Sequence, residues 1–207
     1  MDPKKIQEWE RARLDDPEYY SHHILGQWSD IGEGQVYKDW KFDWQPDPEA
    51  EEIYSIDWGF ASDPTAIIRV LKRGKRLWIE ELCYETGLII SEVADILEAN
   101  GVNKLATIYA DSAEPRSIEE LRRLGYRNIR PAAKGPDSIR AGINKVREFE
   151  VHCNPASVNL IEEYQFYAYK SGTDKPIDDH NHLMDALRYA LSKHRSGPIV
   201  ALPTLTR

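Results

Sequence analysis

The chain has 207 residues, of which 41% are hydrophobic and 30% are charged, as in an ordinary globular protein. Its 27 Lys and Arg against 35 Asp and Glu give a net charge of −8, which argues against a protein that coats nucleic acid. No apolar run reaches the roughly 20 residues that cross a bilayer, and the charged start does not resemble a signal peptide, so neither a membrane nor a secreted protein is predicted. Cys83 and Cys153 lie far apart and outside any Cys-x-x-Cys motif. We expect both to be buried thiols in a reducing compartment.

Residues 1–50 are predicted to form a linker or strap ahead of the main domain. The pattern at 8–20 favours a polar helix, and an irregular aromatic stretch follows at 26–44. We expect this stretch to pack its aromatic side chains onto the domain. Residues 51–195 are expected to form that domain, and residues 196–207 a flexible tail.

Strands and helices follow one another in the main domain in an order typical of an α/β protein. Three strands with hairpin connections come first, and helices then alternate with further strands. The strands are predicted at 53–56, 65–71, 76–82, 105–110 and 128–130, with a small one near 151, and the helices at 91–100, 115–124, 137–149, 155–167 and 180–194. This order predicts a mixed sheet of five or more strands flanked by helices, with the ligand site at the carboxyl ends of its parallel strands.

Two acidic residues, Asp57 and Asp111, each follow an apolar strand. If the strands at 53–56 and 105–110 are parallel neighbours, both carboxylates lie at the same edge of the sheet. Repulsion and burial would then raise at least one pKa, and a divalent cation such as Mg²⁺ or Mn²⁺ would remove that penalty. Each residue alone is a weak signal, because an Asp after a strand is more often a turn or helix-cap residue.

The last predicted helix adds a third acidic residue. His182 and Asp185 are three positions apart and therefore share a helical face, which continues with apolar residues. Asp185 would be costly to bury unless it were paired or bound to a metal. Asp178 and Asp179, just ahead of the helix, are expected to cap it and to favour its dipole.

Positive charge is concentrated in one part of the chain. Nine Lys and Arg stand against three acids between Arg116 and Arg147, so this segment carries +6 and the remainder −14. Most runs of this kind are solvated helical surfaces. The alternative is a cationic track beside the acidic residues, in which Lys134, Arg140 and Arg116 are the expected phosphate contacts if the ligand is DNA.

Four motifs follow one another within about residues 50–193. They are Ile56-Asp57-Trp58-Gly59 with Asp63-Pro64-Thr65-Ala66, Tyr109-Ala110-Asp111-Ser112-Ala113-Glu114-Pro115, the Lys134-Gly135 stretch through Ile143, and His180-Asn181-His182-Leu183-Met184-Asp185-Ala186-Leu187-Arg188-Tyr189. Together they resemble the nuclease domain of tailed-phage terminase large subunits. The resemblance implies a ribonuclease-H-like fold and a metal-dependent endonuclease, a phosphodiester hydrolase that cuts concatemeric double-stranded DNA.

The resemblance also implies the roles of individual residues. By motif matching, the catalytic positions are Asp57, Asp111, Asp185 and His182. The three aspartates would hold two divalent cations, Mg²⁺ or Mn²⁺, with Asp57 between them. Asp63 matches an occasional additional metal ligand, but Asp63-Pro64 could equally be the turn that starts the second strand.

The wider setting follows from the same resemblance. No Gly-x-x-x-x-Gly-Lys-Ser/Thr motif occurs, so the packaging ATPase is expected on another part of a longer protein. Expected partners are that ATPase domain, a portal, a small terminase subunit and DNA, in the host cytoplasm during virus assembly, with no membrane involved.

Three other interpretations remain open from the sequence. A Holliday-junction resolvase or a transposase-like nuclease of the same fold would use the same acids on a different DNA structure. An actin- or sugar-kinase-like ATPase could use Asp57-Trp58-Gly59 as a phosphate loop, but the second Asp-x-Gly loop that this fold needs is not found. A catalytically silent docking module could use the aromatic residues of the first 45 positions as an interface.

Overall fold

The computed structural model describes residues 34–59, 62–179 and 181–192. The helix predicted at 8–20, the tail at 196–207 and His180 lie outside these residues. The strands are β1 (Glu51–Asp57), β2 (Pro64–Arg73), β3 (Arg76–Thr86), β4 (Ile108–Ala110), β5 (Ile129–Pro131) and β6 (Glu150–Cys153). The helices are α3 (Ile90–Ala99), α4 (Pro115–Arg123), α5 (Ser138–Val146), α6 (Val158–Phe166) and α7 (His182–Leu191). None of the described helices is long and apolar enough to cross a membrane.

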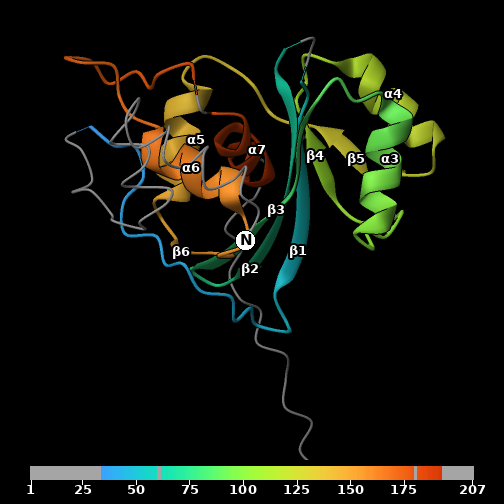
Figure 1. The fold of residues 1–207 in the computed structure, drawn as a ribbon, viewed down its shortest axis with the longest axis horizontal. Helices are drawn as coiled ribbons and strands as arrows, with labels where there is room; N and C mark the ends of the chain where they lie inside the picture. Colours follow the sequence, from blue (N-terminus) through green and yellow to red (C-terminus); the bar gives the residue numbers. More distant parts are fainter. Residues whose placement is uncertain (1–33, 60–61, 180, 193–207) are drawn as a thin grey trace, which may run out of the picture.

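The described strands form one sheet in the order β5-β4-β1-β2-β3-β6 (Figure 1). Strands β1, β2 and β3 are antiparallel neighbours, whereas β4 pairs in parallel with β1 and β5, and β6 pairs in parallel with β3. The predicted mixed sheet of five or more strands is therefore confirmed. The parallel pairing of β1 and β4, on which the acidic-site prediction depended, is confirmed as well.

Helices cover both faces of this sheet. Helices α5, α6 and α7 lie on one face, and α3 and α4 lie on the other (Figure 1). Each face has its own buried apolar cluster, and β1 contributes to both, with Ile53 on the α7 side and Ile56 on the α3 side. This is why the central strands are continuously apolar rather than alternating. Cys83 and Cys153 are both buried, as predicted, in different clusters.

Strand β4 is shorter than the sequence predicts. The apolar pattern extends the strand over residues 105–107, but the backbone of Ala106 donates to Asn103 and that of Leu105 donates to the Asn103 side chain. A turn therefore occupies this region, and the Leu105 side chain is 70% exposed. An apolar residue in a turn looks the same as an apolar residue in a strand, which is why the pattern places the start of the strand too early.

The described part of the aromatic segment packs onto α6, as expected. Trp40 stacks on Tyr164 with ring centroids 4.6 Å apart, and Tyr37 stacks on Trp40 at 5.4 Å. The backbone of Val36 donates to the carbonyl of Tyr167 at 2.9 Å. Residues 34–42 are thus held against α6 and the residue that follows it.

Candidate metal centre

Two carboxylates lie at the edge of the sheet where β1 and β4 end. Asp57 is the last residue of β1 and Asp111 directly follows β4, and the two strands are in register at Ile56 and Ala110. The amide of Asp111 donates to the carbonyl of Ile56 at 3.0 Å, which fixes the two chains together at this point. Asp111 also accepts from the amide of Ala113 at 2.9 Å, so it has the turn role that its position suggested as well.

Helix α7 brings His182 and Asp185 to the same edge. The helix lies against β1, β2 and β4. Its first residue, His182, has Nδ1 at 3.0 Å from Oδ2 of Asp57. Ala186 and Tyr189 on the same face are buried, as the amphipathic pattern predicted.

Burial and like charge shift the titration of these residues. Asp57 is 8% exposed, and desolvation raises the pKa of its carboxyl to about 6, with a further upward contribution from Asp185 and Asp111 and an opposing one from the hydrogen bond to His182. The hydrogen bond to Asp57 raises the pKa of His182. Burial likewise raises the pKa of Asp185, although Arg188 beside it acts in the opposite direction. The three carboxylates therefore interact in a site with little water.

Two basic side chains partly neutralise the negative charge of this site. Lys134 forms an ion pair with Asp111, and Arg188 forms one with Asp185. Arg188 is 5% exposed, and no partner is found among the described residues for its Nε. Arg188 is not among the predicted site residues, although a basic residue three positions after Asp185 on one helix is the spacing typical of such an ion pair.

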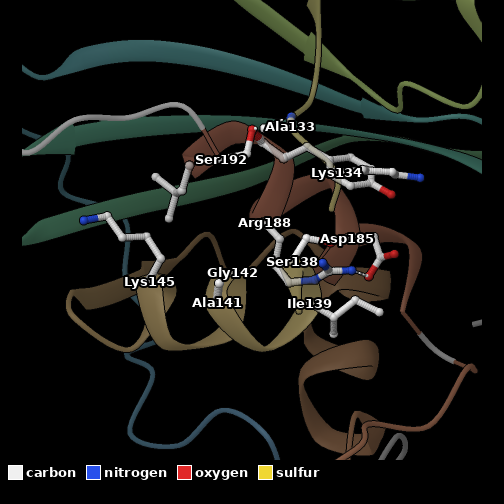
Figure 2. Close-up of a pocket in the computed structure, with 12 residues that line it drawn as sticks. Ala133, Lys134, Ser138, Ile139, Ala141, Gly142, Lys145, Asp185, Arg188 and Ser192 are labelled. Carbon is white, nitrogen blue, oxygen red and sulfur yellow. Dashed lines mark hydrogen bonds and ion pairs between the residues drawn. The ribbon is translucent and has the colours of Figure 1, made fainter. Parts of the chain in front are cut away.

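A pocket of about 440 Å³ lies between α5 and α7 next to Asp185 (Figure 2). Its lining includes Lys134, Ser138, Asp185 and Arg188. At Gly142 of α5, a Cβ would come within 3.1 Å of the Arg188 side chain, so the missing side chain lets the two helices approach. A second pocket, of about 530 Å³, is also lined by Asp185 and Arg188.

Asp63 is exposed and stands in the loop after β1. It is near enough to His182 to contribute to the raised pKa of that residue, but no described side chain pairs with it. The described residues on either side of residues 60–61 contact each other, because the Gly59 amide donates to Oγ1 of Thr65 at 3.1 Å. Both alternatives for Asp63 therefore remain predictions.

The basic segment does not form one continuous track. Arg116 is exposed in the first turn of α4, on the opposite face of the sheet from α5 (Figure 1). Arg140 on α5 lies 3.4 Å from Asp137 and 3.7 Å from Asp174. Arg147 donates to the carbonyl of Val36, a structural contact. Only Lys134 of the three expected DNA contacts touches an acid of the site.

The predicted helix cap of α7 is wrong. Instead of Asp178 or Asp179, Glu163 of α6 accepts hydrogen bonds from the first amides of α7. Asp178 accepts at 3.4 Å from the side chain of Asn181, the residue just before the helix, whose own side chain makes no capping bond. Because the cap comes from another helix, the sequence near α7 does not indicate it, and the pattern points instead to the nearest acids.

The donor chemistry of the site fits divalent cations. Carboxylate oxygens are the ligands that Mg²⁺ and Mn²⁺ prefer, and a bound cation would relieve the penalty that raises the pKa of Asp57. As placed, however, no three His, Cys, Asp or Glu residues of the described ranges are arranged to hold one ion together. Lys134 and Arg188 pair with two of the three carboxylates instead.

A mixed sheet with acids at the ends of two parallel central strands is the arrangement of a ribonuclease-H-like α/β domain, as the resemblance implied. Residues 57–193 match the family described as "Terminase RNAseH like domain". The chain belongs to this family.

Individual relatives agree with this assignment. The chain is 33% identical over 150 residues to the large terminase subunit of Bacillus phage SPP1, a match that covers 67% of this chain and 35% of the relative. It is 29% identical over 147 residues to the PBSX phage terminase large subunit of Bacillus subtilis, which covers 67% of this chain and 34% of that relative. It also resembles the crystal structure of the SPP1 large terminase nuclease domain with bound Mn, with a TM-score of 0.61 and 32% identity over 68% of this chain and 85% of that one. The chain spans about a third of the length of the curated relatives it matches.

Proposed function

We propose that this chain is the nuclease part of a viral DNA-packaging terminase and that it cuts concatemeric double-stranded DNA by divalent-metal-dependent hydrolysis. The observation that carries the proposal is the buried Asp57 at the sheet edge, whose pKa is raised in part by Asp111 and Asp185. The bound Mn in the related SPP1 nuclease domain supports the choice of cation.

The side chains have distinct roles in this proposal. Asp57, Asp111 and Asp185 would hold two divalent cations, Mg²⁺ or Mn²⁺, and Asp63 is the candidate fourth ligand. When bound, such cations supply an activated water and stabilise the leaving oxygen of the phosphodiester. His182 holds a proton at Nδ1 against Asp57 and orients that carboxylate.

The basic side chains around the site bind DNA in this proposal. Lys134 lies next to Asp111 and can hold a phosphate close to the cleavage position, and Arg140 and Arg116 are more distant contacts. A net charge of −8 implies weak affinity of this part for DNA on its own. We propose that a packaging ATPase part, a portal and a small subunit deliver the DNA in the host cytoplasm.

Nuclease activity on supercoiled plasmid with Mn²⁺ tests the proposal. Asp57→Asn and Asp185→Asn should each lower the rate by more than about 100-fold, because even changes to residues that only orient the metal ligands cost about 10–100-fold. Asp95→Asn, which alters an exposed acid on α3, is the matched control and should cut normally. Undiminished cutting by both site variants would refute the assignment, and selective cutting of branched DNA would favour a resolvase.

A further inference from the structure

The carboxylate of Glu163 holds the first turn of the helix that carries His182 and Asp185. Its Oε1 accepts from the amide of His182 at 3.0 Å, and its Oε2 accepts from the amides of Leu183 at 2.8 Å and Met184 at 3.0 Å. These are amides that a helix leaves without partners at its start. Tyr84 of β3 also lies near this carboxyl and lowers its pKa, against the effect of burial.

The Glu163 carboxylate is unusual because it is almost completely buried. Glu163 is 1% exposed, and a carboxylate removed from water is destabilising unless hydrogen bonds replace the lost hydration. The helix N-terminus supplies these bonds and a favourable dipole. Since α7 has no side-chain cap of its own, the position of its first turn depends on α6.

Helix α6 is itself held by a carboxylate from the sheet. Oε2 of Glu81 on β3 accepts from the amide of Leu160 at 3.0 Å, and its Oε1 accepts from the side chain of Asn159 at 2.5 Å. Oγ of Ser157 accepts from the amide of Glu81 at 2.9 Å. The sheet therefore fixes α6 through Glu81, and α6 fixes α7 through Glu163.

We infer that Glu163 is a positioning residue for the acidic site, which sets where His182 and Asp185 stand relative to Asp57. His182 links the two, since its backbone amide bonds to Glu163 and its ring lies 3.0 Å from Asp57. A shift of the first turn would move His182 away from Asp57 and carry Asp185 with it. The inference rests on the proposed function only where it concerns metal binding.

Amide hydrogen exchange on the metal-free protein tests the positioning directly. In Glu163→Gln the side-chain NH₂ group must face either the amide of His182 or the amides of Leu183 and Met184, which now donate to an oxygen. Exchange should become about tenfold faster or more at whichever of these amides loses its acceptor. The amide of Ala141 in α5, which donates to the carbonyl of Asp137 at 2.9 Å, should exchange at the wild-type rate. Glu162→Gln removes the same charge one residue away and is the matched control.

The consequence for the site is measured with Mn²⁺. Glu163→Gln should raise the Mn²⁺ dissociation constant, determined by calorimetry, by about tenfold, as loss of a residue that orients the ligands does at other metal sites. Tyr84→Phe removes only the hydroxyl and should change the exchange rates and the Mn²⁺ affinity in the same direction but by less. This variant provides the test if Glu163→Gln does not fold. Glu162→Gln should bind Mn²⁺ like the wild type.

The outcomes separate this inference from the proposed function. Wild-type exchange rates and Mn²⁺ affinity in Glu163→Gln would overturn the positioning role and leave the nuclease proposal intact. Failure of the wild type to bind Mn²⁺ would count against the nuclease proposal, and the exchange experiment would still decide whether Glu163 fixes α7.

Discussion

Nδ1 of His182 and Oδ2 of Asp57 lie 3.0 Å apart and join the first residue of α7 to the last residue of β1. The two residues are 125 positions apart in the chain, so this contact exists only when the sheet and the last helix have come together. It also couples their protonation, because the hydrogen bond raises the pKa of His182 and lowers that of Asp57 against the effect of burial.

The metal-free protein should lose stability as the pH rises from about 4 to about 8. Burial raises the pKa of Asp57 from 3.8 to about 6 and that of Glu163 from 4.5 to about 7, and the pKa of His182 is also raised. The folded state therefore binds protons that the unfolded state releases, which makes the free energy of unfolding fall with rising pH. Urea unfolding should show that Asp57→Asn removes on the order of 2–3 kcal/mol of this fall, at about 1.4 kcal/mol per pKa unit.

Two controls make that measurement specific. Asp95→Asn should keep the wild-type pH profile, since its carboxyl is exposed. Saturating Mn²⁺ should flatten the profile of the wild type, because cation binding favours the deprotonated carboxylates. A metal-free profile that is flat across this whole pH range would contradict the proposed coupling.

Replacement of Arg188 should destabilise the metal-free protein strongly. Arg188→Met leaves the carboxylate of Asp185 in a largely buried site without its ion-pair partner, a change that typically costs about 3–5 kcal/mol. The double variant Arg188→Met with Asp185→Asn should recover most of the loss in urea unfolding. Arg123→Met, on the exposed side of α4, should be nearly neutral, and an equal loss there would show that the ion pair is not the cause.

Gly59→Ala should disrupt the loop that follows Asp57. A Cβ at this position would overlap the carbonyl oxygen of Asp63 and the backbone between Pro64 and Thr65. Since backbone cannot move aside as a flexible side chain can, the free energy of unfolding should fall by more than about 2 kcal/mol. Gly135→Ala has no atom within 4 Å of the added carbon and should stay within about 0.5 kcal/mol of the wild type.

Loss of Lys134 should weaken DNA binding uniformly across sequences. Its ammonium group pairs with Asp111 of the proposed site, and its side chain is 40% exposed, so it can reach a phosphate. Lys134→Ala should reduce retention of DNA on a filter at low salt and lower the slope of log affinity against log salt by about one. Lys75→Ala, in the β2–β3 turn, should bind like the wild type. Equal retention by both variants would make Lys134 a surface charge only.

Much of the fold could be predicted because short stretches of the sequence determine its strands and turns. The apolar runs that become β1 and β2 and the turn between β2 and β3 are visible in the sequence, and Asp57 and Asp111 were placed correctly because each ends such a run. The contacts that organise α7 could not be predicted in this way. Glu163 looks like one of two neighbouring solvated acids until the fold buries it beneath another helix.

Residues 34–42, ahead of the sheet, contact α6, the helix whose Glu163 accepts hydrogen bonds from the first amides of α7. The side chain of Gln35 donates to the carbonyl of Tyr164, and Trp40 stacks on the ring of that residue, next to Glu163 in the chain. A displacement of residues 34–42 would therefore shift α6, and through Glu163 it would shift the first turn of α7.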